Sequence, residues 1–135
     1  MNKIIFLAIV LFLATIGIAS AQQSVVVPAT TNQISITGTV AVATRVITGI
    51  TGKRIYVTAV GLTPVATSVV TFTTGTGSNC GTGTASITGA MTFAAGQELN
   101  IGTGNGAIFV LPAGNDLCIT IATAAAPGFL AYAIF

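Results

Sequence analysis

Beyond residue 32, short runs of Val, Ile, Thr and Phe alternate with clusters of Gly, Asn and Pro, and this pattern constrains the fold more than any other feature. β-branched and aromatic residues favour strands, whereas Gly, Asn and Pro favour the turns between them. Short strands with frequent turns, and no long run at helical spacing, are typical of a sandwich or barrel. The expected strands are residues 33–42, 45–50, 54–62, 68–74, 90–94, 98–101, 107–111, 117–122 and 129–135.

Several of these runs alternate apolar and polar residues with a period of two. Leu117, Ile119 and Ile121 share one face of their run, whereas Cys118 lies on the other face. A period of two indicates a strand with one buried face and one polar or half-polar face. We therefore expect residues 33–135 to form one all-β domain, a single antiparallel β-sandwich, with a jelly roll of eight or nine short strands as its arrangement.

The first 21 residues have the three parts of a secretory signal peptide. Lys3 gives a positive start, an apolar run extends to Ile18, and small residues precede the expected cleavage between Ala21 and Gln22. An apolar run of about 15 residues is shorter than the roughly 20 residues that span a bilayer, so we interpret it as part of a cleaved signal and not as an anchor. We expect no membrane span after cleavage. Removing 21 of the 135 residues leaves a mature chain of 114 residues. We expect this chain to be secreted, extracellular or at a cell surface, or periplasmic, with residues 22–32 as an arm or linker.

The mature chain carries very few charged side chains. They are Arg45, Lys53, Arg54, Glu98 and Asp116. An ordinary domain has about a quarter charged residues. A nearly uncharged surface favours association. We therefore expect part of the outer surface to be buried, against further copies in a homo-oligomer such as a trimer or within a larger surface assembly. Lys53 and Arg54 are interpreted as a solvated strand end.

Cys80 and Cys118 are the only cysteines of the chain. An even pair in an exported protein indicates one disulfide. It would close a loop of about 37 residues, worth about 4 kcal/mol in the chain-entropy treatment. We expect it to attach the Gly-rich loop 75–83 to the strand that follows the turn 112–116. A metal site is the weaker interpretation, because no His accompanies the two thiols.

The side chains offer little for catalysis. The mature chain has no His, which excludes Ser/His/Asp and Cys/His nucleophilic systems. Glu98 and Asp116 are the two carboxylates that a glycosidase would need, but Asp116 lies beside Asn115 and is interpreted as a turn residue. Gly75 and Gly77 lack the third Gly, the Lys and the helix of a phosphate-binding loop. We expect no enzyme, no catalytic or cofactor-binding residue, and no cofactor.

Metal and nucleic-acid sites are equally poorly supplied. Calcium sites need clustered oxygen ligands that include carboxylates, and no such cluster occurs. Three positive side chains do not form the basic patch that nucleic acid requires. We therefore expect neither a metal site nor a nucleic-acid partner.

Five segments carry a resemblance to a known group of proteins. They are residues 51–57, Phe72, the Gly-rich loop at Cys80, residues 112–119 and residues 128–135. Together they resemble small structural proteins encoded by tailed phages and metagenomic viral contigs. The resemblance covers about residues 49–135, and it implies a β-sandwich or jelly-roll decoration protein of a phage head or tail. The signal peptide departs from this pattern, because a virion protein assembled in the cytoplasm needs no export. This departure favours an envelope, extracellular or cell-surface setting.

Four functions remain open at this point. The leading one is a structural protein that self-associates into a surface coat, a fibre or a virion decoration. The alternative is a secreted adhesive module that recognises glycan or a protein surface through its loops. A small outer-membrane β-barrel fits the export and the final Phe135, although such a barrel needs at least eight strands of about ten residues. A pilin that exchanges residues 24–28 as a donor strand is also open.

Overall fold

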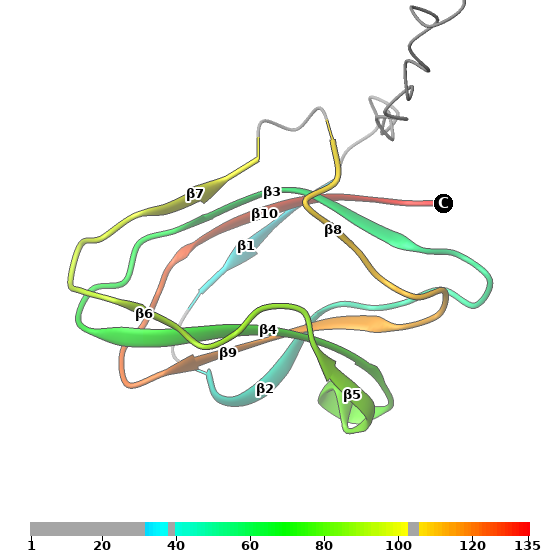
Figure 1. The fold of residues 1–135 in the computed structure, drawn as a ribbon, viewed down its shortest axis with the longest axis horizontal. Helices are drawn as coiled ribbons and strands as arrows, with labels where there is room; N and C mark the ends of the chain where they lie inside the picture. The colour runs from blue at the N-terminus through cyan, green and yellow to red at the C-terminus, as the bar shows by residue number, and fades with distance from the viewer. Residues whose placement is uncertain (1–31, 38–39, 103–105) are drawn as a thin grey trace, which may run out of the picture.

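The structure is a computed structural model that describes residues 32–37, 40–102 and 106–135. The expected signal peptide, its cleavage site at Ala21 and Gln22, and the expected arm up to residue 31 lie outside the described residues. The described part of the chain forms two antiparallel five-stranded sheets that pack face to face (Figure 1). Its one helical element is the 3-10 turn η1 (Ser78–Cys80), and none of its helices is long and apolar enough to cross a membrane.

Each sheet has four strands in its main order and a fifth that pairs with an inner strand. The first sheet contains β1 (Asn32–Ile36), β10 (Gly128–Ile134), β3 (Ile55–Leu62), β7 (Leu99–Ile101) and β8 (Phe109–Val110). The second sheet contains β2 (Val40–Ile47), β9 (Asp116–Ala122), β4 (Ser68–Thr76), β5 (Thr82–Ser86) and β6 (Met91–Phe93).

The strand order is that of a jelly roll. Strands β7 and β8 pair with opposite ends of β3, and β5 and β6 pair with opposite ends of β4. The ten strands therefore fill eight positions, in the orders β1-β10-β3-β7/β8 and β2-β9-β4-β5/β6. Two facing four-position sheets between which the chain repeatedly crosses are the jelly-roll form of the β-sandwich. The expected fold class is confirmed.

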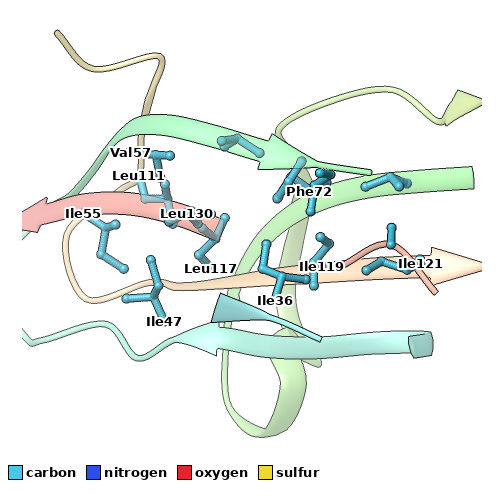
Figure 2. Close-up of a cluster of buried hydrophobic side chains, with 14 of the residues drawn as sticks. Ile36, Ile47, Ile55, Val57, Phe72, Leu111, Leu117, Ile119, Ile121 and Leu130 are labelled. Carbon is cyan, nitrogen blue, oxygen red and sulfur yellow. The ribbon is translucent and has the colours of Figure 1, made fainter. Parts of the chain in front are cut away.

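Apolar side chains of both sheets meet between the layers (Figure 2). Leu117, Ile119 and Ile121 are all buried there, as the alternation of their run predicts. The rings of Phe72 and Phe109, one from each sheet, have centroids 5.8 Å apart. Removing this apolar surface from water is the main stabilising contribution to such a fold.

Several strands expected from the sequence have different bounds in the structure; for example, the expected strand 45–50 is the second half of β2, which ends at Ile47. The run 33–42 is not one strand, because β1 ends at Ile36 in the first sheet and β2 begins at Val40 in the second. The alternation continues through this crossing, so periodicity alone does not locate it. Strand β5 was not expected from the sequence: its first two residues belong to the expected Gly-rich loop 75–83 and the other three follow it. All of its residues are exposed, so it lacks the apolar face that would reveal a strand. It forms nevertheless, because β4 provides a free edge for pairing.

Candidate interaction surface

The predicted disulfide between Cys80 and Cys118 is present, with the two Cα atoms 6.3 Å apart. Cys80 belongs to η1, where Asn79 and Cys80 both have positive φ, and Cys118 lies on the outward face of β9. Both cysteines are buried because η1 covers this part of the sheet. The Thr84 hydroxyl donates to the Cys80 carbonyl and closes the loop. The disulfide therefore fixes the Gly-rich loop onto β9.

Asp116 has a larger structural role than the turn residue expected from the sequence. It begins β9, and its carboxyl group is buried. Oδ1 accepts a hydrogen bond from the Gly49 N–H at 2.7 Å, and Oδ2 lies 3.3 Å from Nη1 of Arg45. The backbone N–H of Arg45 donates to the Asn79 side chain at 3.2 Å. Asp116 therefore joins β2, β9 and the turn before β3, and its charge is paired with Arg45.

Lys53 and Arg54 lie together at the end of the sandwich where β3 begins. Both residues are exposed. Lys53 accepts a backbone hydrogen bond from Gly114, and Arg54 exchanges two backbone hydrogen bonds with Phe135, of 2.7 and 3.1 Å. The backbone beneath both cations is therefore held in place, while the side chains remain accessible. Their interpretation as a solvated strand end is confirmed.

A groove of about 190 Å³ lies at the opposite end of β3. Its lining residues are Gly61, Leu62, Thr63, Glu98, Leu99, Asn100, Gly128 and Phe129. A Cβ on Gly128 would collide with the carbonyl oxygen of Gly61, and a Cβ on Gly61 would collide with the Phe129 ring. The two glycines therefore allow β3 and β10 to approach closely and the ring of Phe129 to lie over β3.

The outward face of the first sheet is uncharged along β3, β8 and β10. The pairing between these strands places small, aliphatic and aromatic residues there, of which Ala59 and Ala133 are themselves buried. They are Tyr56, Ala59, Gly61, Val110, Phe129, Ala131, Ala133 and Phe135. Tyr56 and Phe135 pack with ring centroids 5.6 Å apart. Val110, Phe129 and Phe135 remain 46%, 36% and 43% exposed. We call this set of residues the apolar face.

The outward face of the second sheet is different, because Thr dominates it. Thr71 lies opposite Thr120, and Thr73 lies between Cys118 and Ser86. Thr branches at Cβ, which suits a strand, and its hydroxyl keeps the face polar without charge. The two sheets therefore expose chemically distinct surfaces.

The two carboxylates belong to different sheets and differ in exposure. Glu98 is exposed just before β7 of the first sheet, whereas Asp116 is buried at the start of β9 in the second and is paired with Arg45. The described residues contain no group of three or more His, Cys, Asp or Glu that could hold a metal ion.

The fold and these surfaces define a disulfide-linked jelly-roll protein with an apolar face on one sheet and charges of opposite sign at its two ends. Comparisons with protein families, with curated proteins and with solved structures find no match for the chain. Neither the apolar face nor the groove was predicted from the sequence. The available signal was small residues around Phe129, with Gly128 just before the expected strand 129–135 and Ala131 on the same face of it.

Proposed function

We propose that this protein is a non-enzymatic structural subunit, exported from the cell, that assembles with copies of itself into a surface coat, a fibre or a virion decoration. The apolar face is the observation that carries this proposal. Isolated exposed apolar residues are ordinary on a protein surface, whereas several large ones on one uncharged sheet face favour an interaction site. Here three partly exposed large side chains share such a face, with Val110 and Phe135 near the start of β3 and Phe129 near its end, and with Ala59 and Ala133 buried between them.

The low charge of the molecule supports the same function. One of its exposed cations, Arg45, is already paired with Asp116, so few charges oppose close approach of two copies. Proteins with a net charge near zero associate more readily than strongly charged ones. Jelly rolls also form the shells of viral capsids, which is consistent with an assembly role, although a fold alone does not determine function.

Light scattering after size-exclusion chromatography tests this function. The full chain is expressed in a host that exports it, and the secreted product is examined without detergent over a wide range of protein concentrations. We expect a defined trimer, ring or larger particle. A monomer at every concentration would contradict the proposal.

An adhesive binding module is the second candidate, because the groove places the Phe129 ring beside Glu98 and Asn100. An aromatic ring and hydrogen-bonding side chains could contact the apolar and hydroxyl groups of a glycan. A monomer whose melting temperature rises with a particular glycan would favour this function over self-assembly.

A further inference from the structure

The unpaired charges of the sandwich are separated by sign along β3. Lys53 and Arg54 come directly before β3. Glu98 lines the groove together with Gly61 and Leu62, which are the last two residues of β3. Seven or eight strand residues at roughly 3.3 Å each place the two ends about 25 Å apart. Figure 1 shows the turn that leads into β3 and the start of β7 at opposite ends of the molecule.

The charge difference between the two ends persists when neighbouring groups are counted. Even with the carboxylate of Phe135 counted as an anion beside Arg54, the two cations leave this end net positive. Among the described residues the one ion pair joins Arg45 to Asp116. It lies at the same end as Lys53, because Asp116 accepts from Gly49 before β3 and Gly114 donates to the Lys53 carbonyl, and it adds no net charge there. The groove end has a single charged lining residue, Glu98, and is negative.

The groove has the chemistry to receive a cation. The Phe129 ring is 36% exposed and lines the same hollow as Glu98. An ammonium or guanidinium group is attracted both to the face of an aromatic ring and to a carboxylate. Asn100 and Thr63 add side-chain oxygens to the lining, and no Lys or Arg lines the groove. An anionic occupant would be repelled by Glu98.

We propose that the groove at Glu98 and Phe129 receives Lys53 and Arg54 of a second copy of this chain, so that the molecules associate end to end. This inference rests on the proposed self-assembly and specifies its geometry. A two-fold contact that places one of these ends against itself would bring like charges together, whereas a head-to-tail contact joins opposite charges. Head-to-tail contacts repeat, and they produce a ring if the rotation closes and a filament if it does not.

Charge reversal tests this arrangement. E98K puts a cation into the groove, and the double variant K53E/R54E puts anions at the other end. We expect each variant alone to need a roughly tenfold or higher concentration for half-assembly, because an attractive contact becomes repulsive. All three residues are exposed, so the melting temperature of each variant should stay close to that of the wild type.

Mixing the two variants provides the decisive measurement. In the mixture, the groove of E98K carries a cation and would attract the acidic end of K53E/R54E. The groove of K53E/R54E is unchanged and would attract the basic end of E98K. An equimolar mixture should therefore form assemblies in which the two variants alternate and which are larger than those of either variant alone, measured by light scattering. T92K adds a positive charge to an exposed residue of the second sheet and is the matched control, which should assemble normally.

Salt dependence gives an independent readout. Raising sodium chloride from about 0.1 M to about 1 M shortens the Debye length from about 10 Å to about 3 Å, so wild-type assembly should weaken. Wild-type-like assembly of E98K, or two folded variants that fail to assemble when mixed, would overturn the head-to-tail contact while leaving self-assembly itself intact. A wild-type protein that never assembles would instead overturn the proposed function.

Discussion

At the scale of single residues, the buried carboxylate of Asp116 is the most consequential polar group of the sandwich. Its carboxylate accepts a hydrogen bond from the Gly49 N–H and pairs with Arg45, so D116A would leave a half-buried backbone donor without its partner. We expect D116A to lower the free energy of unfolding by about 1–3 kcal/mol, the usual cost of an unsatisfied buried group. Urea unfolding followed by circular dichroism measures this change.

The partner of Asp116 provides the comparison. The Arg45 side chain is 43% exposed, and exposed ion pairs contribute at most about 1 kcal/mol. R45A should therefore cost clearly less than D116A. Equal losses in the two variants would mean that the ion pair, and not the hydrogen bond to Gly49, is what stabilises this corner.

At the scale of elements, the close approach of β3 and β10 depends on two glycines. A Cβ on Gly128 would collide with the backbone of Gly61, which cannot move without disturbing the sheet. We expect G128A to destabilise the protein by about 1–3 kcal/mol or more, as overpacking does. The same substitution at Gly89, where a Cβ would meet no atom within 4 Å, is the control and should change the free energy of unfolding little. A stable G128A variant would show that the two strands can separate.

The disulfide acts between elements, because it fixes η1 to β9. Replacing both cysteines with Ala keeps the buried positions apolar and removes the cross-link. We expect the double variant C80A/C118A to lose about 2–4 kcal/mol of unfolding free energy. Wild-type protein in reducing agent should show a similar loss in thermal or urea unfolding. A much smaller loss would mean that η1 is held mainly by its hydrogen bonds to Thr84 and β2.

The sequence predicted most elements, and the physical basis of each outcome is clear. Strands such as β4 and β9 were predicted because one face is buried and the other is not, which leaves a period of two in the sequence. Strand β5 has no buried face and therefore leaves no such pattern. The register between two strands depends on how they pair in the folded protein. The pairing of Gly61 on β3 with Phe129 on β10 therefore could not be predicted from either strand's sequence alone.

At the scale of the whole molecule, the parts of the candidate site that depend on residue composition could be predicted from the sequence, and the parts that depend on the fold could not. The disulfide was foreseen, because it followed from an even cysteine pair. The association expected from the low charge stays a prediction. The groove was not predicted, because its residues come from β3, β7 and β10 and from segments separated along the chain. Only the fold brings Glu98 next to Phe129, and only the fold separates both from Lys53 and Arg54.

The apolar face and the charged ends make separable contributions to assembly, and V110K distinguishes them. Val110 is 46% exposed on β8, opposite Tyr56 near the basic end. Lys at this position adds positive charge to the end that would enter the acidic groove, so the charge effect alone would strengthen a head-to-tail contact. If the apolar face is buried between copies, however, the introduced lysine would oppose that burial, because an ammonium group buried without a partner is costly. We expect V110K to weaken assembly, measured by light scattering across protein concentration.

The matched control for V110K is V42K, since Val42 is 72% exposed on β2 of the second sheet. If both variants weaken assembly equally, added net charge is the cause and the apolar face has no special role. If V110K assembles more strongly than the wild type, the charged ends dominate and the face stays exposed to solvent. Loss in V110K with normal assembly in V42K would place the apolar face inside the contact between copies.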